Sequence, residues 1–239
     1  MWCDLEQSVW QELKKLNLIQ RKLLLCCSGG ADSVTLFWVL KNLNLKFSVI
    51  HFHHGKIQNK AQSEFRDRAA IFVEKLCEAQ GVLCEIHKSS TGLLGEAEAR
   101  DFRRSVLFAR AKNSWILMAH HRDDLLETRL MRLIRGTGPQ GLKSMQIKKG
   151  VLIRPFLETS AQELKHYLKT KNKDWLEDPS NQDSRYLRNW LRNHWIPALE
   201  ARQPGAAKRL SLSLESLSQN KSPWFAASIK RDGHIKLEV

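Results

Sequence analysis

The sequence predicts an α/β protein, in which a parallel, twisted sheet carries helices on both faces and a helical part follows at the C-terminal end. Short apolar runs of strand length alternate with amphipathic helical segments over the first two thirds of the chain, which is the pattern of a parallel α/β sheet. The strand candidates are continuous apolar runs without polar alternation, as expected for strands that are buried on both faces. After about residue 155 the strand signals fade.

Each element follows from local periodicity. The first helix, over residues 2–20, shows apolar residues at steps of three or four: Trp2, Leu5, Val9, Leu13 and Leu16. We expect the following elements next, in chain order: a strand over 23–27, a helix over 32–43, a strand over 47–52, a helix over 60–80, a strand over 82–87, a helix over 96–112, a strand over 115–120 and a helix over 124–133.

The C-terminal part reads as helical. We expect helices over 160–169 and 184–201, with Pro197 bending or interrupting the second one. Leucines over 210–217 favour a further helix, although their spacing is partly that of a strand, and residues 220–239 resemble a hairpin or a loose tail. We therefore divide the chain into a sheet domain, 1–155, and a helical extension, 156–239.

Charge points to a polyanionic partner. The 239 residues contain 39 Lys and Arg against 25 Asp and Glu, which gives a formal net charge of +14. Clustered basic side chains attract phosphate backbones through counterion release, so nucleic acid is the favoured partner, with solubility alone as the alternative.

Cysteine usage indicates a reducing cytoplasm. There are five cysteines, an odd number, and no C-x-x-C pair, so neither a disulfide framework nor a thiolate metal or iron–sulfur site is predicted. No early apolar run is long enough for a signal peptide or a membrane span, and we expect no membrane partner.

The first motif directly follows a strand and opens a helix: Ser28, Gly29, Gly30, Ala31, Asp32 and Ser33. Glycines let the backbone approach an anion, and successive backbone N–H groups at a helix N-terminus bind phosphate. Asp32 is an acid in such a loop, which is reasonable if Mg²⁺ or a nearby base offsets the repulsion. The alternative is a plain strand–turn–helix with a Ser or Asp cap.

Two further segments carry candidate site residues. His54 ends the second strand and is suited to phosphate contact or proton transfer, although a histidine there can also simply cap the strand. Arg100 and Arg103 stand about one turn apart on a helix and are suited to gripping a phosphate or carboxylate, with a solvated helix face as the alternative.

The segment after the fourth strand is the most informative. His121 is followed by Asp124 and Glu127, two acids three residues apart whose carboxylates face one way at a helix start. Such a cluster fits Mg²⁺ or a substrate ammonium group, while helix capping is the bland alternative. Because the loops at 28–33, 53–58 and 120–124 all follow strands, we expect them to converge at one edge of the sheet.

Two later segments complete the candidates. Arg135 and Gly136 begin a glycine-rich loop that could close over a nucleotide. Arg188 and Arg192 are neighbours one helical turn apart, and they either meet RNA phosphates or are ordinary surface or packing arginines.

Residues 28–33, SGGADS, resemble the PP-loop of the ATP pyrophosphatase superfamily. An ordered series of further segments resembles the tRNA(Ile)-lysidine synthetases: HHG (53–55), EAEARDFR (96–103), AHHRDDLLET (119–128), RGTGPQGL (135–142), RPFL (154–157), DPSN (178–181), RNWLRN (188–193) and IP (196–197). The resemblance covers about residues 20–200. Lys56, Arg104 and Leu125 depart from the usual Leu, Tyr and Gln.

The resemblance implies a ligase that uses ATP and Mg²⁺ to adenylate the cytidine at the first anticodon position of tRNA(Ile) with a CAU anticodon. Free L-lysine then displaces AMP from C2 and gives lysidine, after pyrophosphate has left. It implies catalytic roles for Asp32, His54, His121, Asp124 and Glu127, nucleotide contacts from 28–33, Arg135 and Gly136, and Mg²⁺ at Asp32 and Asp124.

The same resemblance implies tRNA or substrate contacts from Arg100, Arg103, Arg188 and Arg192, and a short form without the family's C-terminal tRNA-binding domains. A homodimer is left open. The alternatives are a PP-loop tRNA thiolase, against which the absent C-x-x-C argues, and a nucleotide-regulated RNA-binding protein without turnover. A small-molecule amide synthetase fits the charge of +14 less well.

Overall fold

The chain folds into two compact units. The structure, a computed structural model, describes residues 2–93, 95–110, 114–219, 227–229 and 235–237. The first unit comprises Met1–His121 and Ile147–Ser180, and the second comprises Arg122–Gln146 and Asn181–Val239. This division differs from the expected boundary at residue 155, because the chain leaves the first unit after His121 and returns to complete its sheet.

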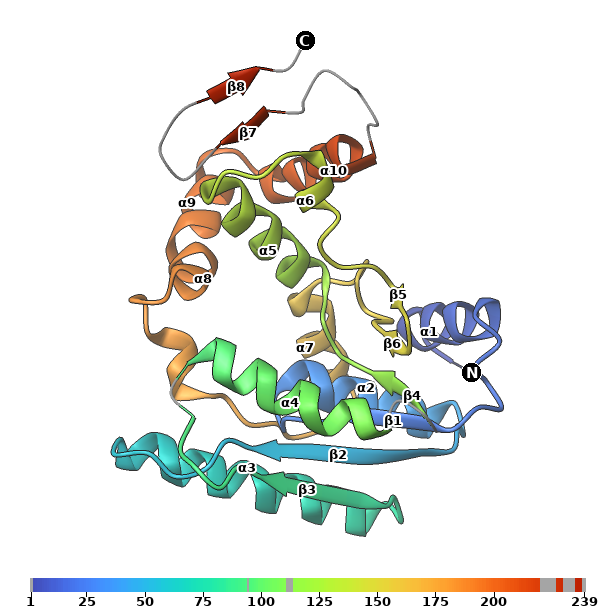
Figure 1. Cartoon of the computed structure of the whole chain (residues 1–239). Coiled ribbons are helices and arrows are strands. Elements are labelled where there is room, and N and C mark those ends of the chain that lie inside the picture. The colour runs from blue at the N-terminus through green and yellow to red at the C-terminus, as the bar shows by residue number, and fades with distance from the viewer. Residues whose placement is uncertain (1, 94, 111–113, 220–226, 230–234, 238–239) are drawn as a thin grey trace. The chain divides into compact units, whose positions relative to one another are not determined.

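The first unit is built on a six-stranded sheet in the order β3-β2-β1-β4-β6-β5 (Figure 1). Its strands are β1 (Leu23–Cys26), β2 (Phe47–His53), β3 (Cys84–Lys88), β4 (Trp115–Leu117), β5 (Lys148–Lys149) and β6 (Leu152–Ile153). All neighbouring pairs are parallel except β5 with β6. The four expected strands and the parallel sheet are confirmed. The sequence did not indicate β5 and β6, which have two residues each.

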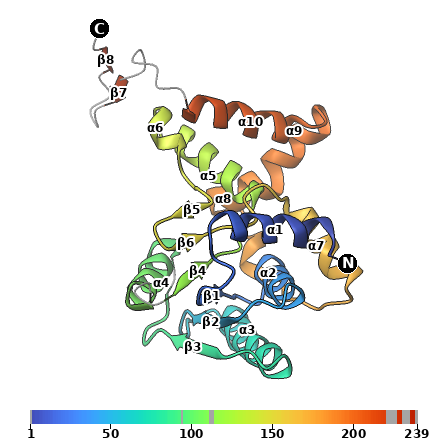
Figure 2. The ribbon, with the colours of Figure 1, turned by 90° about the vertical axis from the view of Figure 1, so that its right-hand side faces the viewer.

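Helices cover both faces of this sheet (Figure 2). They are α1 (Asp4–Lys15), α2 (Ala31–Asn42), α3 (Lys60–Ala79), α4 (Glu96–Arg110) and α7 (Ala161–Thr170). Alternate residues of β1 enter two different cores: Leu23 and Leu25 join the core that α1, α2, α3 and α7 complete, while Leu24 joins the core beneath α4 with Leu107. Burial on both faces explains the continuous apolar run of β1, as expected.

Helix α7 belongs to the sheet unit because buried polar contacts attach it to α1 and α2. The Thr35 hydroxyl donates to the carbonyl of Leu164 at 3.1 Å. The Tyr167 hydroxyl donates to the buried Glu6 carboxylate at 2.7 Å, and the Asn42 amide donates to the same carboxylate at 2.7 Å. These contacts explain why the expected helical extension does not begin at residue 156.

The second unit is helical. It contains α5 (Arg122–Ile134), α6 (Pro139–Leu142), α8 (Leu187–Trp190), a π-helical turn (Leu191–Trp195), α9 (Ile196–Arg202) and α10 (Ala206–Gln219). Leu126, Leu130, Leu142, Leu191 and Leu214 form its core. The interruption expected at Pro197 takes the form of the π turn, because proline has no N–H to donate to the preceding turn.

Two segments complete the description. A short 3₁₀ turn covers Pro179–Gln182. Two strands, β7 (Ala227–Ile229) and β8 (Ile235–Leu237), pair antiparallel, as expected for a hairpin, while the segment between them lies outside the described residues. Among the described helices, none combines the length and the apolar character that crossing a membrane requires.

Candidate active site

The loop between β1 and α2 folds on itself through Ser33. The buried Ser33 hydroxyl accepts the N–H of Ser28 at 3.1 Å and donates to the carbonyl of Gly30 at 3.1 Å. Gly29 has a φ of +87°, a conformation that glycine adopts without steric cost. Ser33, for which the resemblance implies a nucleotide contact, therefore has a local role in shaping the loop.

The same loop suits an anion. Gly30 precedes the first residue of α2, where the positive end of the helix dipole lies, and no side chain caps that end. Gly30 has an ordinary φ of −76°, and a Cβ atom placed on it would come no closer than 3.5 Å to its neighbours, the nearest being Ser28 Oγ. Neither strain nor crowding within the protein requires glycine here, but the close approach of a phosphate would.

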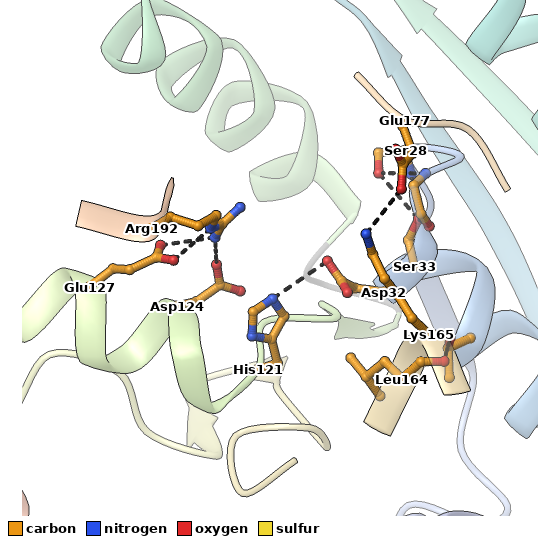
Figure 3. A network of polar contacts seen from close by, with 12 residues as sticks. Ser28, Asp32, Ser33, His121, Asp124, Glu127, Leu164, Lys165, Glu177 and Arg192 are labelled. Atoms are coloured by element: carbon orange, nitrogen blue, oxygen red, sulfur yellow. Dashed lines mark hydrogen bonds and ion pairs between the residues drawn. The ribbon is translucent and has the colours of Figure 1, made fainter. Parts of the chain in front are cut away.

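The segment of Leu176 and Glu177, near the end of the first unit, supports the loop. The N–H of Leu176 donates to the carbonyl of Gly29 at 2.9 Å, and Gly30 forms a parallel bridge with the same residue. The neighbouring Glu177 pairs with Lys165 of α7 at 3.0 Å (Figure 3). The loop is thus held in place by β1 before it, by α2 after it and by the segment of Leu176 and Glu177.

Asp32 and His121 meet at this loop (Figure 3). Asp32 lies in the first turn of α2, and one of its carboxylate oxygens lies 3.6 Å from Nε2 of His121. His121 follows β4, where a bridge to Phe156 extends the pairing of the sheet, and it is only 2% exposed. The structure therefore brings Asp32 of the first motif next to His121, from the segment after the fourth strand.

Asp32 fits a Mg²⁺ ion as a single carboxylate ligand. Its side chain is 39% exposed, so it can accept an ion from solvent. Mg²⁺ commonly binds one or two carboxylates together with waters and substrate phosphates. Within the described ranges no three His, Cys, Asp or Glu side chains gather as a ready-made ligand set, so phosphate oxygens would have to complete the shell.

His54 is held by its backbone at the end of β2. Arg66 of α3 donates to the carbonyls of His54, Gly55 and Leu93 at 3.0, 2.9 and 2.7 Å. Burial, and then the positive charges of Arg103 and Arg66, lower the pKa of His54 to about 4. The imidazole is therefore neutral at pH 7, which argues against a charge-based phosphate contact. Arg103, from the EAEARDFR segment, lies close enough for its charge to act on this histidine.

The preceding His53 fixes the shape of the same turn. Its Nδ1 accepts the N–H of Gly55 at 3.1 Å, so its Nε2 carries the proton and donates to Asp67 at 2.9 Å. Arg66 and Asp67, both on α3, thus hold the HHG segment in place through hydrogen bonds. The motifs gave no sign of either residue, because both lie inside an ordinary amphipathic helix.

The structure also describes Arg100, a predicted contact residue, and His120, which precedes His121. Arg100 is exposed on α4. Nδ1 of His120 accepts a hydrogen bond from Nε of the buried Arg154 at 3.2 Å. Arg154 opens the RPFL segment directly after β6, so this segment supports His120 beside His121.

The second unit brings Asp124 and Glu127 against Arg188 and Arg192. Nε and Nη2 of Arg192 donate to the two oxygens of Glu127 at 2.6 and 2.9 Å, and the same Nη2 donates to Asp124 at 2.9 Å (Figure 3). Nε of Arg188 donates to Glu127 at 2.8 Å, and its Nη2 reaches Asp124 at 3.4 Å. Asp124 and Glu127, which we expected to bind a cation, are thus hydrogen-bonded to two arginines for which phosphate contacts were a candidate role.

Arg135 and Gly136 lie at the end of α5. Gly136 has a φ of +74°, and its N–H donates to the carbonyl of Leu133 at 2.9 Å, as in a glycine-terminated helix. The Arg135 side chain is exposed. This arrangement gives Gly136 a local role in ending the helix, and a nucleotide contact from these two residues stays a prediction.

Comparison with known proteins identifies the family. A family model described as a PP-loop domain matches residues 5–199. The chain is 40% identical over 228 residues to a tRNA(Ile)-lysidine synthase from Bdellovibrio bacteriovorus, covering 92% of this chain and 71% of that protein. It is 38% identical over 211 residues to a protein of the same name from Histophilus somni strain 2336, covering 83% of this chain and 48% of that one.

The fold has further relatives among solved structures. The U34-tRNA thiolase NcsA from Methanococcus maripaludis, solved with its [4Fe-4S] cluster, matches with a TM-score of 0.71 at 17% identity, over 94% of this chain and 80% of that one. At that identity the likeness shows the fold alone. Because a PP-loop model spans most of the sequence and a lysidine synthase is 40% identical over nearly all of it, the chain belongs to the PP-loop family and, within it, to the tRNA(Ile)-lysidine synthases.

Proposed function

We propose that this protein uses ATP to attach free lysine to C2 of the cytidine at the first anticodon position of tRNA(Ile) with a CAU anticodon. The observation that carries the proposal is the glycine loop 28–33 with Asp32 against His121, in a chain 40% identical to a lysidine synthase. The chain spans 71% of that relative and about half (48%) of other curated relatives, so the activity of the whole relatives is carried over as a proposal.

The chemistry has two displacement steps. The cytosine O2 attacks the α-phosphorus of ATP, the bond to the β-phosphate oxygen breaks, and pyrophosphate leaves. The neutral ε-amine of lysine then attacks C2, the C2–O bond breaks, AMP leaves with that oxygen, and the amine loses its proton. The demand on the protein is mainly positioning and charge neutralisation.

In the first step the backbone amides of the loop at Gly29 and Gly30 hold the phosphates at the N-terminus of α2. Asp32 would hold Mg²⁺, which would supply charge neutralisation for the phosphates. His121 keeps the Asp32 carboxylate oriented through their 3.6 Å contact. Because one carboxylate is enough for a phosphate-bound Mg²⁺, we assign the metal to Asp32, and Asp124, bound to two guanidiniums, to a substrate cation.

In the second step the lysine side chain needs an acidic site and a proton acceptor. Asp124 and Glu127 are the acid pair we assign to its ammonium form. His121 is the candidate acceptor of the amine proton. His54, neutral because of its lowered pKa of about 4, is suited to hydrogen bonding with an uncharged group.

The charge of +14 supports the proposed RNA partner. We assign phosphate contacts to Arg100, Arg103, Arg188 and Arg192, and nucleotide contacts to Arg135 and Gly136. Cytoplasmic location belongs to the same proposal, because five free cysteines suit a reducing compartment. A homodimer stays open.

A tRNA thiolase is the second candidate, favoured by the fold shared with NcsA. Cys26 and Cys27 argue against it. Burial raises the pKa of Cys26 to about 12 and that of Cys27 to about 11, which keeps both as inert thiols at neutral pH. No cysteine cluster able to hold a metal occurs in the part of the chain that the structure describes.

The test is mass analysis of tRNA(Ile) after incubation with the full chain, ATP and lysine. We expect a mass gain equal to lysine less water, confined to the anticodon loop and dependent on both small molecules. A tRNA whose first anticodon base is uridine serves as the matched control and should stay unchanged. An unmodified tRNA(Ile), or a mass change that does not require lysine, would refute the proposed activity.

A further inference from the structure

Helix α8 and the π turn after it direct two arginines toward α5. Nε of Arg188 and Nε of Arg192 donate to the Glu127 carboxylate at 2.8 and 2.6 Å. Leu191, between the two arginines, is 1% exposed in the core of the second unit. These contacts fix the rotation of the segment about its axis, so that its opposite side faces solvent.

The solvent side carries two aromatic rings. Tyr186, which directly precedes α8, is 51% exposed, and Trp190, the last residue of α8, is 41% exposed. The N–H of Trp190 donates to the carbonyl of Tyr186 at 3.0 Å, so the two residues lie one helical turn apart. Rings of this size lose hydrophobic stabilisation while they stay in water. Their position therefore suits contact with a partner better than it suits stability.

The turn before α8 is tied to the residues after it. The side-chain amide of Asn193 donates to the carbonyl of Asn181 at 2.7 Å. The Ser184 hydroxyl and Nε2 of His194 share a hydrogen bond of 2.7 Å. Both contacts join the segment across ten residues or more, so the aromatic rings stand on a backbone that is held on either side of them.

Charge indicates which partner this face accepts. The exposed side chains of residues 184–194, a stretch that the structure describes without a gap, are aromatic, neutral or basic: Ser184, Arg185, Tyr186, Trp190, Asn193 and His194. None of them is a carboxylate. Unpaired bases of RNA loops stack on tyrosine and tryptophan, and their phosphates favour a surface without exposed acids. The chain's net charge of +14 favours the same partner.

We propose that Tyr186 and Trp190 form a stacking platform for unpaired bases of the RNA substrate. The inference rests on the proposed function and adds a binding surface to it. The platform takes bases of the anticodon loop other than the reacting cytidine, which has to reach ATP. Because every base has a π face, stacking of this kind contributes affinity for a loop without selecting one base.

The experiment measures binding of the full chain to two labelled RNAs by fluorescence anisotropy. One is a hairpin with the anticodon loop of tRNA(Ile), and the other is a blunt duplex that has no unpaired base. We expect Trp190→Ala and Tyr186→Ala each to weaken hairpin binding on the order of tenfold. Duplex binding should not change, because neither substitution removes a charge. Trp190→Phe keeps a ring and should retain most of the affinity for the hairpin.

Trp2→Ala is the matched control. Trp2 is 37% exposed, close to the value for Trp190, but it precedes α1 in the first unit. We expect this variant to bind both RNAs as the wild type does. Thermal denaturation checks that each variant is folded, and Tyr186→Ala decides the matter if Trp190→Ala is not.

Salt dependence separates stacking from a phosphate contact. Each phosphate contact that is lost makes the slope of log affinity against log salt concentration shallower by a little less than one. We expect the hairpin slope of Trp190→Ala to equal that of the wild type, with the affinity lower at every salt concentration. A shallower slope would show that a charge contact was lost, and it would overturn the stacking role.

The remaining outcomes are decisive as well. Unchanged hairpin binding in a folded variant overturns the inference, and so does an equal loss for hairpin and duplex. A wild-type dimer that Trp190→Ala dissociates, measured by sedimentation, would assign the aromatic face to a second copy and also overturn it. Lysidine formation by the wild type together with any of these results rejects the inference alone, whereas absence of lysidine formation rejects the proposed function.

Discussion

The glycine loop of the first unit and the acid–arginine cluster of the second unit are built in opposite ways. The hydrogen bonds that shape the loop join Ser33 to Ser28 and Gly30, five and three residues away. The cluster joins α5 to residues 61 to 68 positions later in the chain. The loop therefore takes its turn from its own residues, with support from the distant Leu176, while the cluster depends entirely on how distant helices pack.

The two sites also differ in burial. Asp32 is partly exposed, at 39%, whereas Glu127 is 0% exposed. Replacing an acid in the first site should therefore affect chemistry more than folding, and in the second site it should affect both. The following experiments test this contrast, beginning with the largest expected effect.

Asp32→Ala should reduce lysine- and tRNA-dependent AMP formation by a factor on the order of 10²–10³, because charge near the phosphates is no longer neutralised. Stability should change by no more than about 0.5 kcal/mol, since the side chain is near the surface. Asp4→Ala, an exposed acid in the first turn of α1, is the control and should leave turnover unchanged. Undiminished turnover in Asp32→Ala would reject the assigned role.

Glu127→Gln should lower the free energy of unfolding by about 3 kcal/mol, because two guanidinium groups lose most of their buried counter-charge. Urea denaturation followed by circular dichroism measures this change. Glu64→Gln removes a carboxylate that is 62% exposed and pairs with Lys60, and we expect less than about 1 kcal/mol there. Equal effects of the two substitutions would contradict the contrast in burial.

Substitutions at two neighbouring glycines of the loop should separate an effect on ATP binding from an effect on stability. Gly30→Ala should weaken ATP binding about tenfold, or about 1.4 kcal/mol, without loss of stability, because its backbone and surroundings accept a Cβ. Gly29→Ala should cost about 1–2 kcal/mol of stability because its φ of +87° disfavours L-residues. Calorimetry with an ATP analogue and thermal denaturation distinguish the two. Equal stability of both variants would disprove the backbone argument.

Glu6 offers a pH test of a long-range contact in the first unit. Burial raises its pKa, but hydrogen bonds from Asn42, the Cys3 N–H and Tyr167 outweigh burial and leave the pKa below the ordinary 4.5. A lowered folded-state pKa stabilises the protein above pH 4.5, and this contribution is lost as pH falls through the folded value. Glu6→Gln should therefore cost about 1 kcal/mol at pH 7, with the difference from wild type shrinking in acid. A difference independent of pH would reject this explanation.

Local pattern was sufficient for much of the fold. The apolar runs at β1, β2, β3 and β4 and the helices between them are readable because burial on both faces of a parallel sheet leaves a direct mark on each strand. Pairs of residues such as β5 and β6 are too short to carry periodicity. Local pattern also did not indicate that α7 packs in the first unit, because the contacts that attach it involve Glu6 and Thr35, more than a hundred residues earlier.

Among the candidate residues of the two units, the sequence alone determined the glycine loop, the acids and histidines after β4, and the arginines of residues 188–192, because each group is chemically recognisable within a few residues. Only the tertiary structure decided which of them meet. Asp32 gained His121 as a neighbour, and Asp124 and Glu127 gained the arginines. The physical reason is that charge pairing depends on distance in space, and packing brings together groups that the chain holds far apart.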